Sequence, residues 1–205
     1  MNHVVTEKKS WTGSMGSAAS IMLGLFLLFA SSSALAEHFH YFVDVETHFA
    51  VNQHNQITAL DISWVYDEKM SALMKKRNAN LKALGQATMN DLRRAHYFTN
   101  VKFNGKPVKT GVVRSFNLQE FTQNGKTALQ LDFTLPLQRP INMQGKNKLS
   151  WTFADPAGVG ILVYYTPKNI LLGPVLKKHC KADMKENENA QHGDPEQLLS
   201  LECAI

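Results

Sequence analysis

The sequence lacks any run of lysine and arginine interleaved with aromatic residues, although its formal net charge is +5. The 22 basic and 17 acidic residues are mixed along the chain, so nucleic-acid binding is not predicted. There is also no nucleophile elbow, phosphate-cradling glycine loop or metalloprotease helix. Scattered carboxylates or a Ser/His pair could still meet in space as a hydrolase site, but no spacing predicts it. We therefore expect a protein that is not an enzyme and has no catalytic residues.

Long apolar runs are missing as well. Ile21–Ala30 has about ten residues, whereas a helix needs roughly twenty to cross a bilayer. This run follows two lysines and leads into Ala34-Leu35-Ala36, the pattern that signal peptidase accepts. We interpret residues 1–36 as a cleavable signal peptide that sends the chain to the periplasm, with no membrane span after cleavage. An uncleaved membrane anchor is the alternative. Position 37 is glutamate, so a lipoprotein anchor on cysteine is not expected.

Cysteine is nearly absent, with only Cys180 and Cys203 in 205 residues. An even pair in an exported chain most simply forms a disulfide, because the compartment is oxidising. The other interpretation makes His179 and Cys180 a metal or redox site, but one histidine beside one cysteine is weak support for it. The sequence therefore predicts a Cys180–Cys203 disulfide.

Two segments near the start of the predicted mature chain alternate between apolar and polar residues. They are Phe39–Val51 and Ile57–Tyr66, and a period of two is typical of half-buried strands. A tight turn at His54-Asn55 would join them in a register that places apolar residues opposite apolar ones. The predicted pairs are Phe49 with Leu60, Val45 with Trp64, Val43 with Tyr66, His48 with Asp61, and Glu46 with Ser63.

Helical spacing follows this hairpin. Asp67 can cap a helix whose buried stripe is formed by Met70, Leu73 and Met74. A second, short helix is predicted after Thr88, with Asp91 completing a capping box. On that helix, Leu92 and Ala95 are expected to face inward.

Strand patterns return in the second half of the chain. Asn104-Gly105 and Asn124-Gly125 are strong hairpin turns, because both central positions need positive φ. Residues 181–197 are polar and predict a loosely ordered tail, in which His192 has no role. The domains expected are a signal at 1–36, one domain at 37–180, and a tail at 181–205 tethered by the disulfide. The predicted fold is mostly β (α+β): an antiparallel β-sandwich with a two-helix insertion after the first hairpin.

The most suggestive chemical pattern is His38-Phe39-His40, at the start of the predicted mature chain. Residues two apart on a strand project from one face with Cα atoms about 6–7 Å apart, so the two imidazoles could share a metal ion. Imidazole suits zinc, copper, nickel and cobalt, and the sequence does not choose among them. Asp44 continues this face, about 13 Å beyond His40 along the strand, so other ligands must come from elsewhere in the fold. Alternatively, the face is an ordinary water-facing surface and the two histidines are accidental.

The order of several short motifs is similar to an uncharacterised bacterial family, domain of unknown function 1007. The opening His38–Asp44 and the segment Ile62–Glu68 carry the resemblance first. The later motifs are Tyr97-Phe98-Thr99, Asn104–Val108, Phe133–Leu137 and Asp155-Pro156. The resemblance covers most of residues 38–180, and its specificity comes from the order of the motifs.

The resemblance implies a periplasmic component of an uncharacterised ABC-type transport system, often encoded beside metal exporters. It thus implies a metal-associated accessory protein with no established activity. His38, His40 and Asp44 match the family opening, and Asp67 and Asp155, each expected at a strand end, match the later motifs. We take these five residues as the candidate metal ligands. Two departures matter: Phe39 stands where the family usually has proline, and Lys75–Asn78 replaces an Asp-rich, calcium-loop-like insertion. No calcium site is therefore expected.

Two functions remain open from the sequence. The first is a periplasmic accessory to transition-metal transport that binds a divalent ion (zinc, nickel, cobalt or copper) through the terminal His-x-His and contacts a membrane component of the transporter. The second is a protein-interaction module of an ABC-type transport system that binds no metal. Metal identity, transported species, partner and oligomeric state are not determined by the sequence.

Overall fold

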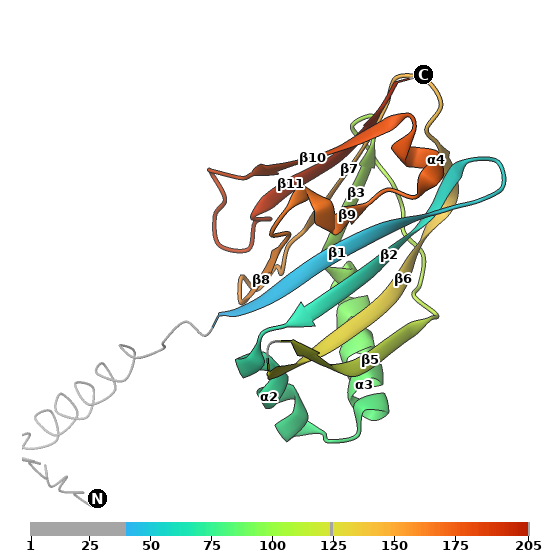
Figure 1. Cartoon of the computed structure of the whole chain (residues 1–205). Coiled ribbons are helices and arrows are strands. Elements are labelled where there is room, and N and C mark those ends of the chain that lie inside the picture. Colours follow the sequence, from blue (N-terminus) through green and yellow to red (C-terminus); the bar gives the residue numbers. More distant parts are fainter. Residues whose placement is uncertain (1–39, 124, 205) are drawn as a thin grey trace, which may run out of the picture. The chain divides into compact units, whose positions relative to one another are not determined.

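The computed structural model describes residues 40–123 and 125–204, which belong to one compact unit (Figure 1). The predicted signal peptide, residues 1–36, and His38 lie outside the described residues. Within the described part of the chain, no helix is both long and apolar enough to cross a membrane.

The described chain forms two sheets. In the first sheet the strand order is β5 (Phe116–Gln123), β6 (Lys126–Asn142), β2 (Gln56–Tyr66), β1 (Tyr41–Val51) and β8 (Gly160–Val163), and β9 (Ile170–Leu171) also pairs with β1. In the second sheet the order is β10 (Cys180–Glu186), β11 (Gln197–Cys203), β7 (Asn147–Phe153), β3 (Thr99–Phe103) and β4 (Lys106–Pro107). Neighbouring strands are antiparallel except where β1 meets β8 and β9. The predicted β-sandwich is confirmed.

The register of the first hairpin is the predicted one. All five predicted pairs between β1 and β2 are present, and the alternation buries Val43, Val45 and Phe49 on one face of β1. The register shifts once, between Ala50 and Val51, where the hairpin approaches its turn. Apolar matching on one face is thus enough to set this pairing, because a slip of one residue would move every apolar side chain to the solvent face.

The two helices follow the hairpin as predicted, but with different bounds. Asp67 caps α2 (Glu68–Arg77) by accepting the backbone N–H of Met70 at 2.7 Å. In α2 Met74 is buried, but Leu73 is exposed, contrary to the predicted stripe. The second helix, α3 (Leu81–Arg94), begins at the cap Asn80, well before Thr88. The predicted start was wrong because Thr88 is internal to the helix.

The core lies between the sheets and under the helices. Phe49 of β1 packs edge-on against Trp151 of β7, with ring centroids 5.2 Å apart. Trp151 also donates its Nε1–H to the buried hydroxyl of Tyr164 at 3.2 Å, and that hydroxyl is hydrogen-bonded to Thr47 of β1. Helix α2 contacts β6 and helix α3 contacts β5, and these two strands lie at the β5 edge of the first sheet (Figure 1). One continuous core therefore joins both sheets and the helical insertion.

The last segment differs most from the prediction. Instead of a loosely ordered tail, residues 180–186 and 197–203 are strands β10 and β11, paired along their whole length and joined to β7. Leu199, Leu201 and Cys203 alternate as buried residues of β11, a short pattern that the polar stretch before it obscures. The domain therefore extends to the end of the described chain.

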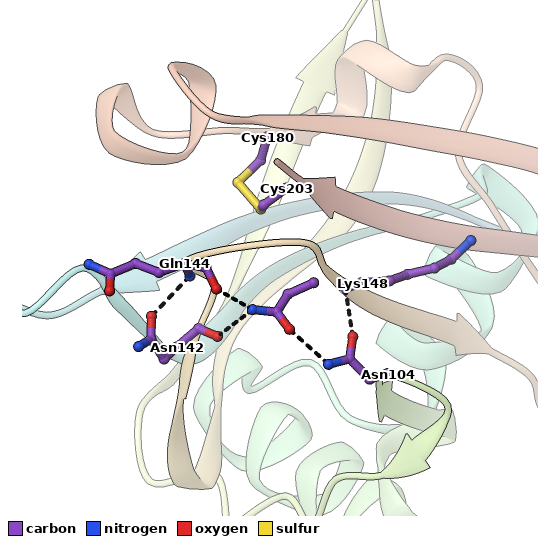
Figure 2. Close-up of a disulfide and its surroundings, with 7 residues drawn as sticks. Asn104, Asn142, Gln144, Lys148, Cys180 and Cys203 are labelled. Atoms are coloured by element: carbon purple, nitrogen blue, oxygen red, sulfur yellow. Dashed lines mark hydrogen bonds between the residues drawn. A yellow bond between two sulfur atoms is a disulfide. The ribbon is translucent and has the colours of Figure 1, made fainter. Parts of the chain in front are cut away.

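The Cys180–Cys203 disulfide is confirmed, and it joins paired residues at the open end of the β10–β11 hairpin (Figure 2). Polar side chains order the neighbouring turns. Asn104 donates to the side chain of Asn147 at 2.8 Å and accepts the backbone N–H of Lys148 at 2.8 Å. The disulfide therefore fixes the edge strand β10 at an end of the sheet that is already well hydrogen-bonded.

Candidate metal centre

His40 immediately precedes β1, and its imidazole is exposed. The strand is anchored at this end by its next two residues. Tyr41 donates its backbone N–H to the carbonyl of Val159 at 3.1 Å, and Phe42 donates its N–H to the carboxylate of Asp67 at 2.6 Å. The first described histidine is therefore attached to a fixed strand end.

The loop between β10 and β11 brings a second histidine to this place. Turn hydrogen bonds order the loop, including one from the backbone N–H of Gln191 to the carboxylate of Asp194 at 3.0 Å. His192 lies against Gly158, which has φ +64°, and a Cβ at Gly158 would overlap the imidazole. Gly193, with φ +87°, lets the loop approach the carbonyl of Pro156. The loop thus packs on the turn that follows β7.

The rings of His40 and His192 lie edge to face, with centroids 6.3 Å apart and an interplanar angle of 78°. Both side chains are exposed. Two imidazoles bound to one tetrahedral zinc ion, with Zn–N distances near 2.0–2.1 Å, have centroids about 5 Å apart. The observed separation of the two rings is about 1 Å larger than this. The sequence alone gave His192 no role, and this pairing is the main feature that it missed.

Asp67 has a structural position in the described chain. One carboxylate oxygen of Asp67 caps α2, and the other accepts the backbone N–H of Phe42. The backbone N–H of Asp67 donates to the carbonyl of Phe42 at 2.9 Å. The residue therefore ties the start of β1 to the start of α2. Its two oxygens are occupied by backbone donors rather than directed to the histidine pair.

Asp155 is similar. It is 7% exposed, and its carboxylate accepts the N–H groups of Ala157 at 2.9 Å and Gly160 at 2.8 Å. These bonds shape the turn that carries Gly158, on which His192 packs. Asp155 therefore positions the candidate site, and its predicted use as a direct ligand has no support in this geometry.

Replacing Asp155 with alanine is expected to lower the free energy of unfolding by about 2 kcal/mol, because the buried N–H of Gly160 and the partly buried N–H of Ala157 lose their acceptor. Urea unfolding at pH 7 measures this change. Asp183→Ala is a matched control, since Asp183 lies on the edge strand β10 and makes an ion pair with Lys185 at the surface. A loss no larger than that of the control would contradict the structural role of Asp155.

Asp44 and two tyrosines complete the surroundings. Burial raises the pKa of Asp44, and the negative charge of Asp67 raises it further. A hydrogen bond with the side chain of Tyr165 offsets part of this increase. Burial, followed by the charges of Asp155 and Asp67, raises the pKa of Tyr41 to about 12. Asp67 and Asp155 thus hydrogen-bond to backbone groups of β1 and β8 near the start of β1, and Asp44 is the fourth residue of β1. Across residues 40–123 and 125–204, however, no three His, Cys, Asp or Glu side chains are grouped closely enough to hold a metal.

A signal for His192 was present in the sequence but was not used. His192-Gly193-Asp194-Pro195 has the composition of a turn, and it precedes an alternating apolar segment. Together these features are typical of a hairpin. Which loop that hairpin would contact could not be inferred, because it depends on the order of strands in the second sheet.

The comparison with protein families agrees with the motif order. The family described as "Protein of unknown function (DUF1007)" matches residues 22–199, which is most of the chain. The chain belongs to this family. No curated protein matches the sequence. DUF1007 membership thus supports the resemblance seen in the motifs, while the family description carries no activity.

Proposed function

We propose that this DUF1007 protein is an exported, periplasmic accessory of transition-metal transport that binds a divalent ion at the start of β1. The observation that carries the proposal is the proximity of the His40 and His192 rings. His38 precedes His40 by two residues, so the chain offers a third imidazole. Three imidazoles with an open fourth position suit zinc, and also copper, nickel or cobalt.

Export is supported by two features. The disulfide between Cys180 and Cys203 is typical of oxidising compartments, and the sequence before Glu37 has the pattern of a signal peptide. The association with a transporter is supported by the family resemblance, which implies the periplasmic component of an ABC-type system. A membrane component of a metal transporter is therefore the partner that we propose.

Isothermal titration tests the metal site directly. In the chain from Glu37, His40→Ala is expected to raise the Kd for zinc at least tenfold, because one of three ligands is lost. His38→Ala/His40→Ala is expected to abolish saturable binding of zinc, nickel and copper. His54→Ala is the matched control, since His54 is exposed in the β1–β2 turn at the opposite end of the strand. Equal affinities in all four proteins would reject the proposal.

A second candidate function is a metal-independent interaction module, and an exposed apolar strip favours it. Phe42 of β1 is 47% exposed and pairs with Ile161 of β8, and Tyr165 just beyond β8 is 68% exposed. Phe42 and Ile161 belong to the first sheet, and Tyr165 follows it two residues after the end of β8. The titration separates the two functions, because this second candidate predicts no metal binding.

A further inference from the structure

A hollow of about 610 Å³ lies on the second sheet, across the neighbouring strands β10, β11, β7 and β3 (Figure 1). It opens on the face turned away from the core: Leu199 and Leu201 are buried in the core, so the side chain of Ser200 between them points to the outer face. The volume is within the range of small-molecule sites. Neither His40 nor His192 lines the hollow, so it is separate from the proposed metal centre.

The polar part of the hollow is one row of side chains across three strands. Ser150 of β7 pairs with Lys102 of β3 on one side and with Ser200 of β11 on the other, and all three residues line the hollow. Directly opposed residues on antiparallel strands have Cβ atoms about 4.5–5.5 Å apart on the same face. Two hydroxyl groups and one ammonium group are therefore close enough to contact a single small ligand.

The two serine hydroxyls have no hydrogen-bond partner within the described part of the chain. Ser200 is only 8% exposed, so little water reaches it. Its hydroxyl still opens to the hollow, because across residues 40–123 and 125–204 the only fully enclosed side-chain polar atom without a partner is Trp64 Nε1. Buried polar groups in native proteins are usually paired. A ligand oxygen in the hollow would accept the hydrogen bond that Ser200 lacks.

The charge around the hollow is positive. Lys102, Lys148 and Lys185 line it, and Asp183 is the acid among the lining residues. Lys148 makes an ion pair with Glu202 at 2.7 Å, and Lys185 makes one with Asp183 at 3.7 Å. With both acids counted, one positive charge remains, and it belongs to Lys102, which makes no ion pair with another described residue. An excess of positive charge in a concave site favours an anionic ligand.

The other end of the hollow is apolar. It lies where β7 ends and β11 begins, and its lining there includes Ala95, Ala154, Pro195 and Leu198. Leu198 is 46% exposed on the outer face, beside the polar row. The hollow thus offers an anion-binding end and an apolar end to the same ligand.

We propose that this hollow binds a small phosphate monoester of an apolar or aromatic alcohol. The phosphate oxygens accept hydrogen bonds from the Ser150 and Ser200 hydroxyls and from the Lys102 ammonium group, and the organic group packs on Leu198. A phosphate has three free oxygens for these three donors, whereas a carboxylate has two. This inference goes beyond the proposed metal binding and does not depend on it.

Phenyl phosphate is a suitable probe, and the backbone amides of the row report its position. In ¹⁵N-labelled chain from Glu37, titration with EDTA present is expected to move the amide signals of Ser150 and Ser200 with saturation. The signal of Ser63, on β2 of the first sheet, should stay in place. Because EDTA removes metal ions, failure of this experiment would leave the metal proposal intact.

Variants of the row test the contacts. Lys102→Gln is expected to raise the Kd for phenyl phosphate about fivefold, and Lys106→Gln, also exposed on the second sheet but outside the lining, is the matched control. Ser150→Ala/Ser200→Ala should raise the Kd at least tenfold, because two hydrogen bonds to a charged group are lost. Asp183→Asn should lower the Kd about twofold, since it removes a negative charge from the residue paired with Ser200.

Three results would overturn the proposal. The first is an absent shift at positions 150 and 200, or a Kd in the lysine and serine variants equal to that of Lys106→Gln. The second is benzoate binding as tight as that of phenyl phosphate, which would contradict the preference for a phosphate. The third is inorganic phosphate binding as tight as that of the ester, which would contradict the role of the apolar end.

Discussion

Replacing His192 with alanine is expected to weaken zinc binding by the chain from Glu37 at least tenfold. The reason is geometric: His192 comes from the β10–β11 loop, yet its ring lies 6.3 Å from that of His40. If His38 and His40 formed the site by themselves, the loss of His192 would leave the zinc affinity unchanged. The His192→Ala variant therefore separates a site built by the fold from a site built by the terminal peptide.

Zinc competition with a chromophoric chelator measures the affinity, and His179→Ala is the matched control. His179 is also exposed, but it lies at the other end of β10, beside the disulfide. If His192→Ala and His179→Ala bind zinc equally well while His40→Ala binds it weakly, then the loop contributes no ligand and the three-imidazole arrangement is wrong.

Gly158→Ala tests the same contact without removing an imidazole. Gly158 has φ +64°, and a Cβ there would overlap the His192 ring, so the loop must move away. The metal affinity should fall toward that of His192→Ala. We regard this variant as support for the His192 prediction, since the ligands themselves are unchanged.

Opening the disulfide is expected to have the largest effect on stability. The cysteines are separated by 23 positions in the sequence, and closing a loop of that size is worth about 3 kcal/mol in the chain-entropy account. Cys180→Ala/Cys203→Ala should therefore lower Tm by about 6–12 °C. The edge strand β10 pairs only with β11 among the described strands, so it should lose protection first.

Differential scanning calorimetry gives the change in Tm, and hydrogen exchange gives the protection of β10. Wild-type protein under full reduction should behave like the double alanine variant, which controls for the loss of the Cys203 side chain from the core. A decrease in stability below about 1 kcal/mol would contradict this prediction. It would mean that β10 is held mainly by its pairing with β11.

The sequence was most informative where the controlling interactions are local. The β1–β2 register could be predicted because each strand alternates with a period of two and the turn is short, so a single slip exposes the whole apolar face. The Asp67 cap could be predicted because its acceptor and the Met70 donor are three positions apart. The start of α3 was missed because Thr88 resembles a cap, although within the helix its hydroxyl donates to the Leu84 carbonyl.

By itself, the sequence determined the mostly β fold class, the first hairpin, the helix cap, the disulfide and the family. Only the tertiary structure decided that residues after Cys180 are strands, that His192 meets His40, and that Asp67 and Asp155 bind backbone N–H groups. The physical reason is the range of the interactions. Alternation and capping act between near neighbours, whereas the position of the His192 loop follows from how β11 pairs with β7 and how the two sheets pack.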